Sequence, residues 1–255
     1  MSRTEDPQPA SAFIEELLSP ATTEAECPEH GPYRSVEVRV GNRTRWSGCP
    51  ACVRDRALQE YHAELENRVK EQTRRHSESI EERLGAALPE RHRESSLQGF
   101  EARNGKARAT IETVHEFLAH LGSRGSRPTL VVKGPSMSGK THLAAGIRER
   151  AIEQGQVSAY VRIPAFNRYL QSTYPSEERM MLRTLEEPDL LLLDELEIRR
   201  RQPVPEWIGE TILERHEALK ATVLLTSADG EMLDRHLSKR VTSRIAREGA
   251  HGVLE

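Results

Sequence analysis

The sequence predicts an α/β fold in which a parallel sheet lies between helices, preceded by a small hairpin and a long helical segment. Short apolar runs alternate with helical segments over the second half of the chain, and a glycine-rich loop separates one such run from a helix. Further upstream, two pairs of metal-ligand residues surround a β-hairpin signal. We therefore divide the 255 residues into a polar tail (1–25), a metal-binding segment (26–53), a helical linker (54–96) and an α/β domain (97–255).

Composition limits the classes of protein to consider. Hydrophobic residues make up 36% and charged residues 30%, and the net charge is -3. This charge argues against a chain built mainly to coat nucleic acid, but it leaves room for a local basic strip. No stretch approaches the roughly 20 apolar residues of a membrane span. The first residues also lack the apolar core of a secretory signal, so we expect a cytoplasmic protein without a membrane partner.

The metal-binding segment pairs short ligand motifs with a hairpin. Ser35–Val40 alternates apolar and polar residues, and Gly41-Asn42 supplies a turn before Thr44–Trp46. Two Cys-x-x-His/Cys pairs flank this hairpin and together offer three sulfurs and one nitrogen to a tetrahedral structural Zn²⁺. A redox cysteine pair, or a histidine that is incidental, are the alternatives. The four expected ligands are Cys27, His30, Cys49 and Cys52.

The linker predicts one long helix over Arg54–Leu84, because no glycine or proline occurs before Gly85. Apolar residues keep helical spacing at Leu58, Tyr61 and Leu65, after which charged and polar residues interrupt the heptad. Acidic and basic side chains are interspersed. We therefore expect a solvent-exposed connecting helix rather than a sustained coiled coil.

The α/β domain is predicted from four buried strands separated by helices. The expected strands are Leu130–Lys133, Val157–Ile163, Leu190–Asp194 and Val223–Thr226, with His251–Leu254 as one more. The expected helices include Thr110–Leu121, Thr141–Gln154 and Glu206–Leu219. Apolar strands of this kind, alternating with helices, are typical of a parallel sheet that is covered on both faces.

The loop GPSMSGKT over Gly134–Thr141 fits the phosphate-binding pattern G-x-x-x-x-G-K-[ST]. An apolar strand precedes it and a helix follows, which is the context that this motif requires. Lys140 is expected to reach the β- and γ-phosphates of ATP, and the Thr141 hydroxyl to bind Mg²⁺. The residues expected to hold the nucleotide are Gly134, Pro135, Ser136, Ser138, Gly139, Lys140, Thr141 and His142.

The second half of the expected site is the run LLLLDELE over Leu190–Glu197. Asp194 emerges at the carboxyl end of a buried strand, where ligands of open α/β sheets bind, and is expected to hold Mg²⁺. Glu195 is placed to polarise the attacking water as a general base. A carboxylate beside the Mg²⁺ ligand favours an ATPase over a nucleotide kinase, which is the alternative enzyme class.

Beyond about residue 84 the chain resembles the ATPase domain of DnaC-like and DnaI-like helicase loaders, a family that includes the IstB-like transposition helpers. The resemblance is carried by SLQGF, GPSMSGKTHLAAGI, VSAYVRIPAF, DLLLLDELE, TVLLTSADGEML and KRVTSRI. CPEHG with WSGCPAC resembles the zinc-binding segment of many members. The resemblance implies an AAA+ fold that assembles as a homo-oligomer with ATP at subunit interfaces. It also implies that Arg240, or alternatively Arg244, is an arginine finger for a neighbouring site.

One position departs from the family pattern. Where the family usually has an asparagine that orients the attacking water, the run Thr226-Ser227-Ala228 places Ala228. Thr226 or Ser227 is a possible substitute. We otherwise expect slow ATP hydrolysis, with ATP binding as the switch.

The resemblance implies an ATP-dependent loader of a hexameric replicative DNA helicase that also binds single-stranded DNA. The zinc segment weighs against the first alternative, an IstB-like helper ATPase of a transposase, because those helpers typically lack it. A second alternative is a DNA-binding zinc module with a vestigial nucleotide site. Candidate DNA contacts are the basic run Arg199–Arg201 and the aromatic rings of Tyr169 and Tyr174.

Overall fold

The structure is a computed structural model that describes residues 20–41, 43–123, 129–196, 204–228, 231–233 and 237–254. Internal contacts divide the chain into two units, and the division falls between Asn67 and Arg68. It lies inside the long helix α2 (Pro50–Arg83). The four-segment division drawn from the sequence stays a prediction.

The first unit is a three-stranded antiparallel sheet followed by the beginning of α2. Its strands β1 (Thr22–Cys27), β2 (Gly31–Val40) and β3 (Arg43–Trp46) lie in chain order. The β2–β3 hairpin was predicted, whereas β1 was not. Helix α2 begins four residues earlier than predicted, because Pro50 suits the first position of a helix.

The first unit has almost no apolar core. Among its described residues, those that are buried are Cys27, Ser35 and Cys49. The Ser35 hydroxyl donates a hydrogen bond to the Ser47 carbonyl at 2.7 Å, and the Val36 N–H donates to the Ser47 hydroxyl at 2.8 Å. A unit of this size with so little buried apolar surface needs a further source of stability, such as a bound metal ion.

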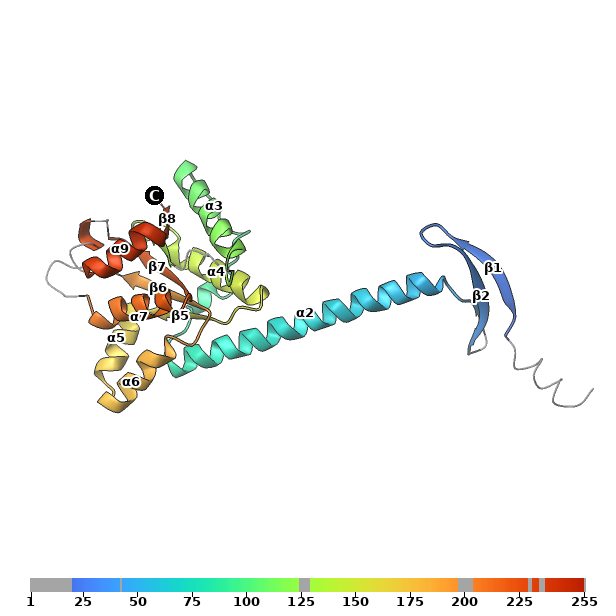
Figure 1. Cartoon of the computed structure of the whole chain (residues 1–255), viewed down its shortest axis with the longest axis horizontal. Helices are drawn as coiled ribbons and strands as arrows, with labels where there is room; N and C mark the ends of the chain where they lie inside the picture. Colours follow the sequence, from blue (N-terminus) through green and yellow to red (C-terminus); the bar gives the residue numbers. More distant parts are fainter. Residues whose placement is uncertain are drawn as a thin grey trace, which may run out of the picture. The chain divides into compact units, whose positions relative to one another are not determined.

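The second unit is built on a five-stranded parallel sheet in the order β5-β6-β7-β4-β8 (Figure 1). The predicted parallel sheet is confirmed, including the additional strand at the end of the chain. The strand bounds are Thr129–Lys133 for β4, Ser158–Arg162 for β5, Leu190–Leu196 for β6, Ala221–Thr226 for β7 and Ala250–Val253 for β8. One strand, β7, stands between the strand that leads into the glycine-rich loop and the strand that carries Asp194.

Helices cover both faces of this sheet (Figure 1). Alternate residues of β4 point to opposite faces, so Val131 belongs to one buried cluster and Leu130 and Val132 to the other. The first cluster receives side chains from the end of α2 and from α5 (Ile163–Gln171), α6 (Pro175–Thr184), α7 (Glu206–Glu217) and α9 (Lys239–Glu248). The second receives them from α3 (Gly105–Ala119) and α4 (Lys140–Glu153). A short 3₁₀ helix, η1, spans Glu90–His92.

The last turns of α2 pack against strand β5. The Ser77 hydroxyl accepts a hydrogen bond from the Ser158 N–H at 2.9 Å, and a Glu81 carboxylate oxygen accepts one from the Tyr160 N–H at 2.8 Å. The same carboxylate forms a bidentate pair with Arg148 of α4, at 2.8 and 2.9 Å. The expectation of a solvent-exposed helix is therefore correct for residues 56–69 and wrong for its last turns. Buried side chains there recur with helical spacing at Thr73, Ser77, Ile80 and Glu81.

Helix α3 makes a comparable contact at the opposite side of the sheet. Asn104 caps this helix by accepting a hydrogen bond from the Ala107 N–H at 2.9 Å. One turn later, the Thr110 hydroxyl accepts from the Val253 N–H and donates to the Val253 carbonyl, both at 2.8 Å. The two outermost strands of the sheet are thus each bound by helix side chains.

Candidate nucleotide site and metal centre

The glycine-rich loop joins β4 to α4 through backbone that only glycine tolerates at two points. A Cβ atom on Gly134 would lie 2.4 Å from the Leu254 carbonyl oxygen and 2.6 Å from the Ser138 hydroxyl. Gly139 has a φ of 91°, in the left-handed region, and serves as the residue before the first turn of α4. Within the described part of the chain, the buried Ser138 hydroxyl has no hydrogen-bond partner. An inward-facing, unsatisfied hydroxyl beside a helix N-terminus suits a phosphate group.

Lys140, Thr141 and Asp194 come together at the carboxyl end of the sheet, as the sequence predicts for a nucleotide site. The Lys140 ammonium donates to the carbonyl oxygens of Gly134 and Pro135, at 2.8 and 2.7 Å. The Thr141 hydroxyl donates to Asp194 Oδ2 at 2.8 Å. A hydroxyl and a carboxylate at this separation fit the two protein ligands that a Mg²⁺ ion takes in such sites.

A tyrosine that the sequence analysis did not single out completes the surroundings of Asp194. The Tyr160 hydroxyl donates to Asp194 Oδ2 at 2.8 Å, and the Glu195 N–H donates to Oδ1 at 2.7 Å. Burial raises the pKa of Tyr160, and the negative charge of Asp194 raises it further. Tyr160 therefore remains a hydrogen-bond donor. Asp194, at 1% exposure, is held by three donors in a buried position.

Glu195 stands in a strained position next to Asp194. Its φ of 60° is in the left-handed region that non-glycine residues rarely adopt, and the pairing of β6 with β7 shifts register between Leu193 and Leu196. At this irregularity the Glu195 side chain is 43% exposed, and its carboxylate lies 3.6 Å from the Arg162 guanidinium. Backbone strain of this kind clusters at functional sites, which suits the predicted general base.

A cavity of about 470 Å³ adjoins the glycine-rich loop. Its far wall comes from the segment before α3, where the Phe100 ring packs edge-on against the His142 imidazole with centroids 5.6 Å apart. The His142 imidazole is also 3.3 Å from the Ser96 carbonyl oxygen. A cavity of this volume has room for the base and sugar of a nucleotide whose phosphates lie in the loop. Loop residues and aromatic residues both line it. Its lining includes Phe100, Arg103, Met137, Gly139, His142 and Leu254.

The two described residues that directly follow β7, Ser227 and Ala228, carry no side-chain amide. Ala228 is buried, and its N–H donates to the Thr226 hydroxyl at 2.9 Å. That hydroxyl in turn donates to the Leu196 carbonyl at 2.7 Å. The Thr226 side chain is thus engaged with the backbone.

The predicted arginine finger is an exposed side chain of α9. Arg240 is in the first turn of α9, is exposed, and pairs with Glu217 of α7 at 2.8 Å. Arg244, one turn on, is 3.4 Å from His216. Of the candidate DNA contacts, Tyr169 and Tyr174 are exposed. The basic run Arg199–Arg201 lies outside the described residues.

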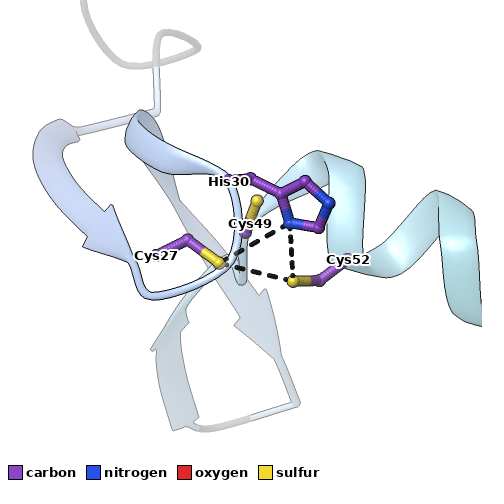
Figure 2. A group of neighbouring side chains, drawn as sticks. All are labelled: Cys27, His30, Cys49 and Cys52. Carbon is purple, nitrogen blue, oxygen red and sulfur yellow. Dashed lines mark hydrogen bonds between the residues drawn. The ribbon is translucent and has the colours of Figure 1, made fainter.

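The four predicted metal ligands converge in the first unit (Figure 2). Cys27 ends β1, His30 follows in the turn before β2, and Cys52 lies in the first turn of α2. The Cys52 sulfur is 3.4 Å from the Cys27 sulfur and 3.3 Å from His30 Nδ1, and all four ligand atoms lie within 4.8 Å of one another. A tetrahedral zinc site with Zn–S bonds of about 2.3 Å separates its sulfurs by about 3.8 Å. The donor set and spacing therefore fit Zn²⁺.

A carboxylate supports the histidine of this cluster. His30 turns Nδ1 toward the cysteines and places Nε2 3.1 Å from Asp55 Oδ2. The hydrogen bond that His30 donates to the Cys27 sulfur, together with the negative charge of Asp55, raises the pKa of His30. Hydrogen bonds from the Glu29 backbone N–H and from His30 lower the pKa of Cys27 to about 6, whereas the hydrogen bond with Cys27 raises the pKa of Cys52 to about 12. Asp55 was not identified from the sequence, although its position three residues after Cys52 puts it one helical turn away.

Among the helices of the described ranges, none has the length and apolar character needed to cross a lipid bilayer.

Comparison with known proteins agrees with this architecture. The family model described as "IstB-like ATP binding protein" matches residues 55–228. Over 165 residues the chain is 26% identical to the uncharacterized protein YdaV of Escherichia coli K12, covering 64% of this chain and 66% of YdaV. Over 125 residues it is 25% identical to the replicative helicase loader DnaC of the same strain, covering 48% and 51%. The chain thus spans about half to two thirds of the length of these relatives.

A solved structure shows the same fold. The crystal structure of DnaI superposes with a TM-score of 0.54 and 20% identity, and covers 66% of this chain and 92% of that one. The predicted resemblance to DnaC-like and DnaI-like proteins and the predicted AAA+ fold are confirmed.

Proposed function

The chain belongs to the family of IstB-like ATP-binding proteins, and from this premise we propose that it is an ATPase that loads a replicative DNA helicase. Membership in this family supports an ATP-dependent role and ATPase activity in general. The observation that carries the loader assignment is a Cys/His-bearing unit placed ahead of an ATPase unit related to DnaC. Helicase loading, DNA binding and oligomer formation are parts of the proposal.

ATP is the proposed substrate, and the glycine-rich loop holds its phosphates. Backbone N–H groups of Ser136–Gly139 and the N-terminus of α4 face the anion, and Ser138 supplies a hydroxyl. Lys140 turns from the loop carbonyls toward the β- and γ-phosphates. Thr141 and Asp194 hold Mg²⁺, which when bound neutralises developing phosphate charge.

Glu195 is the proposed general base for water attack, and Arg240 acts on a neighbouring copy. Glu195 projects from the strained end of β6 while Asp194 stays buried, so the two carboxylates have separate tasks. Arg240 is exposed on α9 and paired with Glu217. An exposed arginine on α9 is accessible to a neighbouring subunit, which supports assembly through ATP-site interfaces.

Zinc is proposed as a structural ion of the first unit. Three thiolates and one imidazole leave no open coordination position, which is the pattern of structural sites. The described core of this unit is too small to account for its stability. Exposed apolar side chains on the same unit, including Leu58 and Tyr61 of α2, support contact with a protein partner such as the helicase.

The test is binding of the purified full chain to candidate hexameric replicative helicases, with ATP and without. Three variants accompany it: Lys140→Ala, Glu195→Gln and the double variant Cys49→Ser/Cys52→Ser. We expect helicase binding that the cysteine variant loses, and ATP hydrolysis that Lys140→Ala and Glu195→Gln lose. Absence of binding to every helicase by the active, zinc-loaded protein would overturn the loader assignment.

A helper ATPase for a transposase is the second candidate, because the matching family model is itself named for IstB. This function needs the same ATP chemistry but a different partner. ATP-dependent assembly on DNA together with stimulation of a transposase, and no helicase binding, would select it.

A further inference from the structure

The two outer strands of the first unit pair with different parts of β2. Strand β1 pairs with β2 over Gly31–Val36, and β3 pairs with the remainder, Glu37–Val40. Glu37–Val40 and Arg43–Trp46 therefore form a two-stranded extension, which we call the arginine ribbon. Its charged residues are three arginines and one glutamate, whereas the whole chain has a net charge of -3.

The arginine side chains of the ribbon have no ion-pair or hydrogen-bond partner among the described residues. Arg39, Arg43 and Arg45 are all exposed, and within the described ranges none of them makes an ion pair or a side-chain hydrogen bond. Arg34, earlier on β2, provides a contrast, because its guanidinium donates to the Thr22 hydroxyl at 3.0 Å. Unpaired guanidinium groups on one short ribbon create a local positive potential that attracts anions.

The register of the ribbon combines these cations with exposed apolar groups. Arg43 lies opposite Val40 and Arg45 opposite Val38, so these four side chains share one face. Val38 and Val40 are 44% and 63% exposed. Residues two apart in a strand are about 6.8 Å apart, so the two guanidinium groups stand in a row along this face.

The other face carries an aromatic ring. Trp46 lies opposite Glu37, on the same face as Arg39, and is 52% exposed. An indole left open to solvent beside an arginine offers a stacking platform for an unpaired base, while the guanidinium groups bind phosphates. Stacking requires unstacked bases, which favours a single strand over a duplex.

We propose that the arginine ribbon is a binding site for a single strand of nucleic acid that passes around the outer edge of β3, with Arg43 and Arg45 on phosphates at one face and Trp46 stacked on a base at the other. This site is separate from the nucleotide site and independent of whether the partner protein is a helicase or a transposase. It gives the first unit a nucleic-acid contact of its own in addition to its metal cluster.

The chain offers a local reporter for the test. Its two tryptophans are Trp46, which is exposed, and Trp207, which is buried in the sheet core. The full-length, zinc-loaded protein is titrated without ATP with an oligothymidylate of about 16 nucleotides, and both tryptophan fluorescence and anisotropy of the labelled strand are followed. We expect quenching in the wild type and none in Trp46→Phe. Trp46→Ala is expected to weaken binding roughly tenfold or more.

Matched variants distinguish binding at the ribbon from a general effect of positive charge. Arg43→Ala/Arg45→Ala is expected to weaken binding and to reduce the salt dependence of log K by about 0.7 for each lost phosphate contact. Arg34→Ala is the control, and one zinc ion per chain in each variant shows that the unit is folded. The proposal is overturned if Arg43→Ala/Arg45→Ala binds the oligonucleotide as tightly as Arg34→Ala, or if the wild type shows no quenching. Quenching by polyglutamate as strong as that by the oligonucleotide also overturns it, and assigns the ribbon to an acidic protein surface.

Discussion

The hydroxyl of Tyr160 and the hydroxyl of Thr141 donate to the same oxygen, Oδ2 of Asp194, each at 2.8 Å. Thr141 belongs to the glycine-rich loop, whereas Tyr160 comes from the neighbouring strand β5. When Thr141 turns to a metal ion, Tyr160 is the side-chain donor that keeps Asp194 in place. Tyr160 is thus a positioning residue for the proposed Mg²⁺ site.

Replacing Tyr160 with phenylalanine removes this donor and keeps the ring. A hydrogen bond to a charged group is worth about 1.5–3 kcal/mol, so the Mg²⁺ concentration that half-saturates ATP hydrolysis should rise roughly tenfold or more. The measurement is the Mg²⁺ dependence of ATPase rate, with Tyr169→Phe as the exposed control. An unchanged Mg²⁺ dependence would exclude a positioning role for Tyr160.

Gly134→Ala tests the packing of the glycine-rich loop. A Cβ atom there would be 2.4 Å from the backbone oxygen of Leu254, so the loop or β8 must move. We expect at least a tenfold loss of affinity for ATP, measured by calorimetry, with the fold retained. Gly105→Ala is the control because a Cβ atom at Gly105 meets no other atom within 4 Å. The interpretation fails if the two variants bind ATP equally.

The features of the site that are local in sequence could be predicted, and those set by packing could not. The loop was predicted because a strand and a helix flank its motif, and Asp194 because it follows a run of four leucines in a buried strand. Tyr160 was missed because its contact depends on the register of β5 with β6, which places Tyr160 beside Leu192 and lets its long side chain reach Asp194.

The burial of α2 was missed for a related reason. Its buried face is partly polar, with Ser77 and Glu81 among its members, so a search for apolar periodicity finds a solvated helix. The burial of Ser77 and Glu81 is explained by strand β5, because both side chains accept hydrogen bonds from its backbone. Asp55 is a comparable case. Its role depends on the position of His30, which the fold places opposite its carboxylate.

The buried pair Glu81–Arg148 allows a double-variant test. Glu81→Leu leaves Arg148 without its partner, and should lower the free energy of unfolding by roughly 3–5 kcal/mol. Glu81→Leu/Arg148→Leu should recover part of this loss but not all, because the Tyr160 N–H still lacks its acceptor. Urea unfolding measures both, and Glu78→Leu is the exposed control on the same helix. No difference between single and double variants would contradict the assigned role of the charge pair.

Arg215 is expected to be a structural residue of large effect. Its buried guanidinium donates to backbone oxygens and one hydroxyl around the start of β6 and β7, namely those of Leu185, Pro188, Asp189, Ala221 and Thr222. Arg215→Leu leaves several of them unsatisfied and should cost about 3 kcal/mol or more. Arg215→Lys should also destabilise, because an ammonium lacks the planar fork. Thermal unfolding checks both, and Arg247→Leu, at an exposed position of α9, should change little.

Removing the carboxylate that faces His30 should weaken zinc binding without removing a ligand. Asp55→Ala is expected to lower zinc affinity roughly 10–100-fold, the usual effect of losing a carboxylate that orients a histidine. Competition with a chromophoric chelator measures this, with Glu60→Ala as an exposed control on α2. Equal affinities would show that Asp55 only packs beside the histidine.

The side chains that bind the outer strands also determine how copies of this chain can associate. An open strand offers its N–H and C=O groups to any other extended segment, including another copy of itself. Here the N–H groups of Ser158 and Tyr160 are occupied from α2, and both backbone groups of Val253 are occupied by Thr110. Growth of the sheet from one molecule into the next is blocked on both sides. In the second unit, contact between copies is therefore left to helices and loops, and in a fragment that lacks the last turns of α2 the backbone of β5 would again be open to another strand.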